Sequence, residues 1–240
     1  MKELQKVMGS TRRALDHYGM IESGDKIAVG LSGGKDSSAL LFTLAKMRSF
    51  YPKSFDVIAI TVDLGFDGFA EQISAMQSFC DSIGVEYRVV KTQISEIVFD
   101  RYAENNPCSL CAKMRRGALV GEASEAGANK IALGHHLGDV VETFMMKLMH
   151  EGNIGCFSPV TYYEDRGISV IRPFIYTREC DIRSLVRAAE LYRADSPCPM
   201  DKNTERENMK TYLREFDREH RGLYDRVLTA LENRRIDGWF

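Results

Sequence analysis

Residues 32–37 form the stretch that most restricts how this chain can fold. They stand between apolar runs at residues 26–31 and 38–44, and they read Ser32, Gly33, Gly34, Lys35, Asp36 and Ser37. That order predicts a buried strand, a glycine turn and the start of a helix. The N–H groups of such a turn and of the first helical turn lack intrahelical partners, and glycines let an anion approach them closely. The sequence therefore predicts a phosphate-binding turn.

The spacing of the glycines distinguishes this turn from a Walker A loop. That loop has four residues between its glycines and then Lys followed by Ser or Thr, whereas Gly33 and Gly34 are adjacent. The stretch instead resembles the PP-loop, the pyrophosphate-binding signature of ATP pyrophosphatases that adenylate their substrates. The resemblance implies that residues 32–37 bind ATP. The alternative is an ordinary turn between a strand and a helix that binds nothing.

Strands and helices are predicted to alternate, which is typical of a parallel sheet covered on both faces. Short strands rich in Val, Ile and Ala are expected at residues 26–31, 57–63, 87–91, 130–135 and 168–172. Helices are expected at residues 3–18, 36–48, 69–83, 113–126, 139–150 and 179–190. We therefore predict an α/β, doubly wound (Rossmann-like, adenine nucleotide alpha hydrolase-like) fold with a five-stranded parallel sheet and flanking N- and C-terminal helices. Residues 1–240 are expected to form a single PP-loop ATPase domain, with a helical lead-in at 1–24 and a helical tail at 201–240.

Three polar residues lie at or just beyond the carboxyl ends of predicted strands: Ser32, Asp63 and His135. Ligands of doubly wound sheets bind at this edge, so we expect the three to converge. Asp63 is interpreted as a nucleotide contact, or else as a turn residue. His135 is a candidate base, phosphate donor or core group. Asp36 is a candidate for Mg²⁺ or its water shell, although a helix N-cap would also suit it.

Composition limits the partners that the chain can have. Of its 240 residues 44% are hydrophobic and 28% are charged, and the formal net charge is −2, so RNA binding requires a local basic patch. The candidate patch is Lys113, Arg115 and Arg116; the alternative is a solvated helix face. No apolar run approaches the length of a membrane span and no apolar signal segment opens the chain, so we expect a cytoplasmic protein with no membrane partner.

Two of the six cysteines form a Cys-x-x-Cys pair, Cys108 and Cys111, just ahead of the helix expected from residue 113. Such a pair can hold a metal, form a redox couple or bind an iron–sulfur cluster. Helix N–H groups and the basic residues that follow are expected to stabilise the thiolates. Cys198 lies between two prolines, which stiffen its loop. Three further cysteines are interpreted as structural thiols: Cys80, Cys156 and Cys180.

Together these features resemble the tRNA 2-thiocytidine synthetase family over nearly the whole chain. The resemblance rests on the PP-loop with its approach at residues 19–26, on residues 108–117, on the stretch from Gly134 to residue 143, on residues 171–173 and on Cys198. Two positions depart from the family pattern. Gly138 replaces the first of two adjacent aspartates, and Met200 replaces a cysteine found in many relatives. The zinc-ribbon cysteines of the related 2-thiouridine enzymes are absent, which favours the cytidine branch.

This resemblance implies an ATP-dependent tRNA sulfur transferase. The C2 oxygen of a tRNA pyrimidine, in the first place an anticodon-loop cytidine, would be adenylated and replaced by sulfur carried on a 4Fe–4S cluster. The implied cluster ligands are Cys108, Cys111 and Cys198. ATP with Mg²⁺ would be bound by residues 32–37, Asp63 and Gly134, and the candidate catalytic residues are Asp36, Asp139 and His135. The expected partners are tRNA, a sulfur donor (a cysteine desulfurase or free sulfide) and a second copy of the chain.

Two other functions remain open from the sequence. The first is a cluster-free adenylating ligase of the tRNA-lysidine type, which would not need Cys108 or Cys111. The second is a non-enzymatic nucleotide-binding module whose Cys-x-x-Cys pair is a structural zinc site or a redox sensor.

Overall fold

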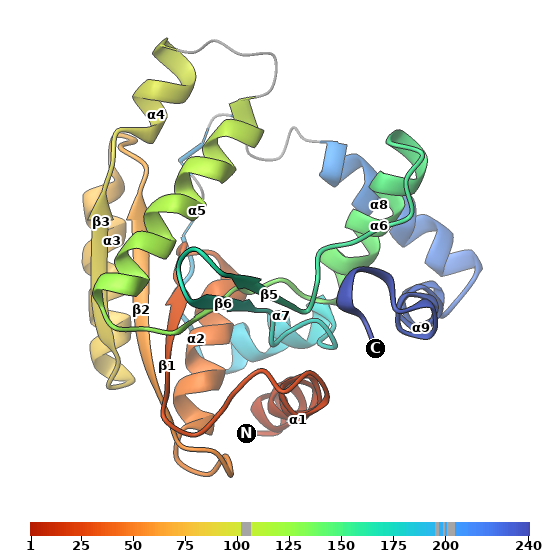
Figure 1. Ribbon diagram of the computed structural model, residues 1–240, viewed down its shortest axis with the longest axis horizontal. Helices are drawn as coiled ribbons and strands as arrows, with labels where there is room; N and C mark the ends of the chain where they lie inside the picture. Colours follow the sequence, from red (N-terminus) through yellow and green to blue (C-terminus); the bar gives the residue numbers. More distant parts are fainter. Residues whose placement is uncertain (102–106, 195–196, 199, 201–204) are drawn as a thin grey trace.

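The first strand, β1 (Asp25–Gly30), lies inside a six-stranded sheet with the order β3-β2-β1-β4-β6-β5 (Figure 1). Its neighbours are β2 (Phe55–Asp63) and β4 (Lys130–Ala132), and both are parallel to it. Beyond them lie β3 (Glu86–Lys91) and β6 (Ile168–Ile171), also parallel, and the antiparallel strand β5 (Val160–Tyr163). This computed structural model describes residues 1–101, 107–194, 197–198, 200 and 205–240.

The order of the strands confirms the predicted α/β fold and places its switch point beside β1. The chain passes from β1 to β2 and β3 in one direction and then returns to add β4 and β6 on the other side. The sixth strand, β5, was not predicted. It is a short strand at the edge of the sheet that pairs Val160 with Ile171, and the turn through Gly167 closes it into a hairpin with β6. Its β-branched and aromatic residues were the available signal.

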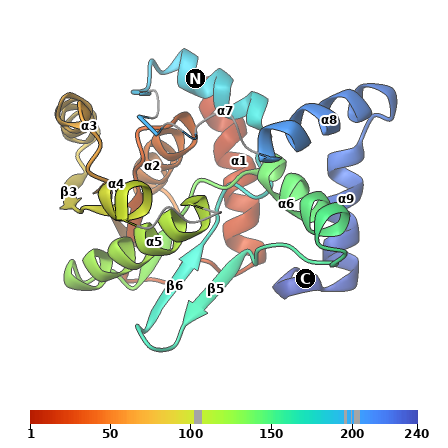
Figure 2. The ribbon, with the colours of Figure 1, turned by 90° about the horizontal axis from the view of Figure 1, so that it is seen from above.

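Alternating side chains of the central strands feed two hydrophobic cores. Ile27 and Val29 of β1 pack into the larger core, whereas Ala28 packs into the smaller core on the opposite face. Helices α1 (Lys2–His17), α2 (Lys35–Met47), α3 (Phe69–Ser82), α6 (Leu137–His150) and α7 (Glu179–Ala188) contribute to the larger core. The smaller core is covered by α5 (Pro107–Glu125), which Figure 2 shows on the other side of the sheet. Between β3 and α5 lie the short α4 (Ile94–Glu96) and a π-helical turn (Ile97–Arg101).

The C-terminal helices pack on the body of the molecule. Helices α8 (Glu205–Glu219) and α9 (Leu223–Arg234) bury Leu213 and Leu231 in the larger core, and a 3₁₀ turn (Ile236–Gly238) follows. Trp239 is fully buried, its indole N–H donates to the carbonyl of Phe157 (3.0 Å), and its ring meets that of Tyr18 edge-on. The tail therefore closes the core beside the end of α1 rather than extending into solvent.

Two predicted boundaries near the functional edge were wrong. Helix α5 begins at Pro107, six residues before the predicted start, because proline has a helical φ and needs no N–H partner in the first turn. Strand β4 ends at Ala132 rather than at residue 135. The chain leaves the ladder there because Gly134 passes closely over the start of α2, where a Cβ would lie 3.0 Å from the carbonyl carbon of Asp36.

Candidate active site

The turn after β1 is shaped by hydrogen bonds among its own residues. Ser37 Oγ donates to the carbonyl of Gly34 (2.9 Å) and lies 3.1 Å from Ser32 Oγ, and the Ser32 N–H donates to Ser37 Oγ (3.2 Å). Gly33 has a φ of +79°, which side chains rarely adopt. Gly34 is the N-cap of α2 and makes no side-chain cap, so the first N–H groups of the helix are open to an anion. Asp36 lies inside the helix and is not its cap.

Lys35 is fixed at this turn by two carboxylates. Its Nζ lies 2.7 Å from Asp36 Oδ2 and 3.1 Å from Oε1 of Glu179, the first residue of α7. Burial works to lower the pKa of Lys35, but the two carboxylates outweigh it and raise that pKa above its ordinary value. The ammonium therefore stays charged beside the open N–H groups of the turn.

Glu179 lies at this site although the sequence did not single it out. Burial favours its neutral form, but the hydrogen bond from Arg183 and the charges of Lys35 and Lys210 hold the pKa of Glu179 well below its ordinary value. Arg214 adds a further contact at 3.0 Å. The carboxylate therefore joins the PP-loop to α8. The sequence showed only a glutamate opening a helix, which is common for reasons of the helix dipole alone.

His136, rather than His135, is the histidine beside the PP-loop. Its Nε2 lies 3.9 Å from Asp36 Oδ1, a buried oxygen with no hydrogen-bond partner among the described residues. Asp139 fixes His136 through a capping box: the His136 N–H donates to Asp139 Oδ2 (2.8 Å), and the Asp139 N–H donates to His136 Nδ1 (3.3 Å). A Cβ at Gly138 would lie 2.7 Å from Cε1 of His136, so the glycine makes room for this ring.

His135 lies at the same edge but turns away from the turn. Its ring packs against that of Phe157, with 4.9 Å between centroids, and its Nδ1 has no partner among the described residues. Burial, opposed by Asp139 and aided by Arg172, lowers the pKa of His135 to about 4. The imidazole is therefore neutral at neutral pH, and its predicted catalytic role stays a prediction.

Asp63 ends β2 at the predicted edge, and its carboxylate takes part in a turn. Its Oδ1 accepts a hydrogen bond from the N–H of Gly65 (2.9 Å), and its carbonyl accepts one from the Thr92 hydroxyl (2.7 Å). This is the turn residue that the sequence offered as the alternative. The turn also orients the carboxylate at the end of β2, so a contact with nucleotide stays a prediction.

Helix α8 supplies a second group of residues that the sequence did not single out. Arg206 lies 3.5 Å from Asp139 Oδ1 and 3.7 Å from Oε2 of Glu142, and it donates to the Thr143 hydroxyl (3.1 Å). Glu142 is almost fully buried. Burial and the neighbouring charge of Asp139, opposed by Lys210 and Arg206, raise the pKa of Glu142 to about 7.

The three predicted cluster cysteines form no disulfides and lie at the same end of the molecule. Cys108 and Cys111 occupy the first turns of α5, three residues apart and so on one face of the helix. Cys198 precedes α8 and is close enough for its charge to act on Cys111. Among the described residues, no three cysteine, histidine or carboxylate side chains are grouped closely enough to hold a metal ion.

The expected stabilisation of the thiolates is wrong for Cys111. Burial raises the pKa of Cys111 above its ordinary value, Arg115 lowers it, and the charges of Cys198 and Cys108 raise it again. Of the three other cysteines, Cys80 and Cys156 are buried, and burial raises the pKa of each to about 12. Cys180 is exposed, so its interpretation as a buried structural thiol was wrong.

The candidate RNA-binding patch is exposed on α5. Lys113, Arg115 and Arg116 follow the cysteine pair within the helix, and none forms an ion pair with another residue in the described part of the chain. Uncompensated cations on an exposed face suit phosphate groups. Their role in RNA binding stays a prediction.

Comparison with known proteins identifies the family. A model of the PP-loop domain matches residues 4–215. The tRNA-cytidine(32) 2-sulfurtransferase of Aliivibrio salmonicida (strain LFI1238) is 39% identical over 236 residues, which cover 95% of this chain and 75% of that protein. The protein of the same name from Tolumonas auensis is 37% identical, with 97% of this chain and 76% of that protein covered. The chain belongs to the tRNA 2-thiocytidine synthetase family of PP-loop proteins.

Solved structures agree with this family. A U34-tRNA thiolase from Methanococcus maripaludis, solved with its 4Fe–4S cluster, aligns with a TM-score of 0.78 and 26% identity over 94% of this chain and 77% of its own. An NH3-dependent NAD synthetase from Campylobacter jejuni shares the fold, with a TM-score of 0.52 and 16% identity. Members of the family are ATP-dependent tRNA sulfurtransferases, so the predicted enzyme class is confirmed. None of the described helices has the length and apolarity to span a membrane.

Proposed function

We propose that this enzyme uses ATP to replace the C2 oxygen of a tRNA cytidine with sulfur, and that its target is the cytidine 32 named for its relatives. The C2 oxygen would attack the α-phosphorus of ATP and release pyrophosphate. Sulfur would then add at C2, and AMP would leave with the original oxygen. The observation that carries the proposal is a PP-loop with open N–H groups and a fixed lysine, at the same end of the molecule as three cysteines that form no disulfide.

The PP-loop supplies the binding and the charge for the first step. N–H groups of the turn, the hydroxyls of Ser32 and Ser37 and the ammonium of Lys35 would hold the β- and γ-phosphates. Gly134 lets the end of β4 approach this turn, and Asp63 would meet the nucleoside part of ATP. The partner-free Oδ1 of Asp36 suits Mg²⁺ or a water bound to it, because Mg²⁺ prefers carboxylate oxygens and retains water ligands.

The donor set of the cysteines fits an iron–sulfur cluster. Cys108, Cys111 and Cys198 would hold it, since thiolates are its usual ligands and all three thiols are unoxidised. When bound, the cluster would supply the sulfur atom to be transferred from an iron that no cysteine ligates. The chain's own part is to present three thiolates at the edge where ATP binds.

The formal net charge of the chain is only −2, so electrostatic repulsion between two copies is small, and we expect a homodimer.

His136 and Asp139 would orient the groups around the α-phosphate. The capping box holds the imidazole with Nε2 toward Asp36, so this ring can donate to a phosphate oxygen or to the Mg²⁺ water shell. His135, neutral and facing Phe157, would form the wall behind it. Lys113, Arg115 and Arg116 would bind tRNA phosphates beside the cysteines. Free sulfide would renew the sulfur, as would a desulfurase-bound persulfide once two electrons from an external thiol reductant release its outer sulfur as sulfide.

The direct test is thiolation by the anaerobically purified chain. It is mixed with ATP, Mg²⁺, sulfide and an unmodified tRNA transcript; pyrophosphate is measured in solution and 2-thiocytidine by mass spectrometry of the digested RNA. We expect wild type to release pyrophosphate and to form 2-thiocytidine. We expect Cys108→Ser to form no 2-thiocytidine and to contain no iron. Full RNA modification by Cys108→Ser would favour the cluster-free ligase, and absence of pyrophosphate release with wild type would contradict both enzymes.

A further inference from the structure

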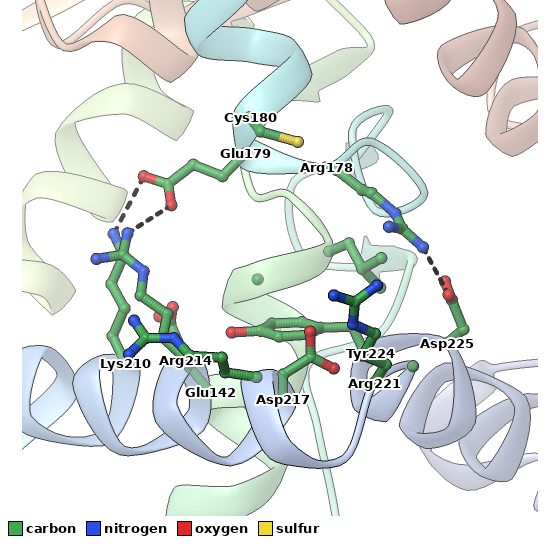
Figure 3. A pocket seen from close by; sticks show the side chains of 14 residues that line it. Glu142, Arg178, Glu179, Cys180, Lys210, Arg214, Asp217, Arg221, Tyr224 and Asp225 are labelled. Atoms are coloured by element: carbon green, nitrogen blue, oxygen red, sulfur yellow. Dashed lines mark hydrogen bonds and ion pairs between the residues drawn. The ribbon is translucent and has the colours of Figure 1, made fainter.

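A cavity of about 470 Å³ lies between the N-terminal turns of α6 and α7 and the facing sides of α8 and α9. Figure 3 shows the two ionic bridges that frame it. On one side Glu179 meets Lys210 (3.2 Å) and Arg214 (3.0 Å), and on the other Arg178 meets Asp225 (2.6 Å). None of the site residues predicted from the sequence is among the residues that line this cavity.

Two arginines of the lining hold charge that the protein leaves uncompensated. Arg218 lies near the end of α8 and Arg221 in the turn that leads to α9, and both line the cavity. Neither side chain forms an ion pair or hydrogen bond with another residue among those described. Arginine presents a planar fork of donors that matches phosphate oxygens.

The carboxyl groups of the lining do not cancel this charge. Glu179 and Asp225 are already paired with cations, and Asp217 accepts the N–H of Leu223 (2.8 Å) as a cap. The fourth carboxyl group of the lining is that of Glu142, and burial raises its pKa to about 7. A ligand that enters the cavity therefore meets free guanidinium groups and few free carboxylates.

An aromatic wall accompanies the arginines. Figure 3 shows the ring of Tyr224 lying across the cavity beside Arg221. Helix α9 begins just before it at Leu223, after the N-cap residue Gly222. A flat ring beside guanidinium groups is the combination with which proteins hold a single-stranded nucleotide, since the ring stacks on a base and the cations bind its phosphate.

We propose that this cavity holds one nucleotide of the RNA substrate outside the reacting centre, with a phosphate on Arg218 and Arg221 and its base or ribose against Tyr224. The inference rests on the proposed function, because it takes its ligand from the RNA to be modified. Glu179 contacts Lys35 of the PP-loop (3.1 Å) as well as the cavity. The bound nucleotide would therefore anchor the RNA one side chain away from ATP.

The test compares RNA and ATP binding by the full chain. Arg218→Ala, Arg221→Ala and Tyr224→Leu are measured against an unmodified tRNA transcript over a range of salt, with melting temperature as the check on folding. We expect each arginine variant to lose about tenfold in RNA affinity and about one in the slope of log K against log salt, as for one lost phosphate contact. Tyr224→Leu should lose affinity with its salt slope unchanged. Arg187→Ala, an exposed arginine in the last turn of α7, is the matched control.

The outcomes separate this inference from the proposed function. RNA affinity and salt slope equal to wild type in folded Arg218→Ala and Arg221→Ala would overturn the cavity as an RNA site, even if wild type thiolates tRNA. If the variants bind ATP more weakly but bind RNA as wild type does, the inference is also overturned, and the cavity is assigned to ATP. If wild type binds RNA through these residues but makes no thiolated product, the inference stands and the proposed function fails.

Discussion

The PP-loop and the three cysteines lie at the same end of the molecule, but they are stabilised differently. The PP-loop is held by hydrogen bonds from Ser32 and Ser37 and by the ion pairs of Lys35, all within this chain. The charges of Cys198 and Cys108 act on Cys111, and the cysteines form no metal-binding group among the described residues. The nucleotide site is thus preorganised by the polypeptide, whereas the cysteine site needs its metal to become a single unit.

This difference predicts that the two sites fail independently. A change that distorts the PP-loop should abolish ATP binding without affecting iron, and loss of a cysteine should have the reverse effect.

The largest effect is expected from Gly33→Val. At a φ of +79° a β-branched residue is strained, and its side chain would press against Ala194, Met76 and Tyr192, so the turn that offers its N–H groups to phosphate would be displaced. We expect ATP affinity to fall by at least about a hundredfold, which at about 1.4 kcal/mol per tenfold corresponds to the loss of a few hydrogen bonds. Calorimetric titration with ATP measures it, and iron content should equal that of wild type.

Gly84→Val is the matched control for this strain. Gly84 also has a positive φ (+65°), lies in the loop after α3 and would place its Cβ in open space. It should cost similar stability and leave ATP binding unchanged. Equal ATP affinity in Gly33→Val and wild type would remove the PP-loop assignment.

The next effect concerns Cys198, which is distant in sequence from the other two cysteines. Cys198→Ala should strip or destabilise the cluster and abolish thiolation, because two thiolates cannot replace three. ATP affinity should stay within about twofold of wild type, since the PP-loop is held by its own hydrogen bonds. Iron per chain after anaerobic purification is the measurement. Cys180→Ala, which removes a thiol outside the predicted cluster, should keep its iron.

Local sequence was sufficient to predict the PP-loop, because a strand, a glycine turn and a helix start follow one another within a few residues. Gly134 was also placed correctly at the edge, since strand ends of a parallel sheet converge there. Glu179, Arg206 and Lys210 were not predicted. They reach the site through the packing of α7 and α8, which no short-range pattern specifies.

The histidine motif illustrates the same limit. His135 and His136 are adjacent, so the sequence placed both at one strand end, and only the capping box with Asp139 decides which ring faces Asp36. The start of α5 was predicted too late because the Cys-x-x-Cys pair was interpreted as preceding the helix, whereas it forms the first turns of α5. Pro107 at the first helical position was the signal that marked the true start.

A smaller effect is expected from Glu179→Gln, which tests whether the PP-loop depends on its link to α8. The folded pKa of Glu179 lies below its unfolded value, so this residue stabilises the fold above about pH 4.3 and loses that contribution as the pH falls further. The melting temperature is measured between about pH 3 and 7. It should change less steeply with pH in Glu179→Gln than in wild type. Glu71→Gln, an exposed glutamate of α3, should follow wild type. Parallel curves for all three would show that Glu179 adds nothing to the stability of this edge.

The smallest effect is expected from Glu142→Gln, and its pH dependence has the opposite sign. Burial and Asp139 of its own helix raise the folded pKa of Glu142 to about 7, against Lys210 and Arg206 of α8, while Glu179 of α7 raises it further. A carboxyl whose folded pKa exceeds its unfolded value favours folding at low pH and loses this contribution as the pH rises through about 7. Glutamine resembles the protonated acid and cannot ionise, so the variant should gain melting temperature relative to wild type between about pH 5 and 8, by a few degrees at most. A difference between variant and wild type that stays constant over this range would show that Glu142 is already ionised in the folded protein, and that Arg206 rather than burial determines its charge.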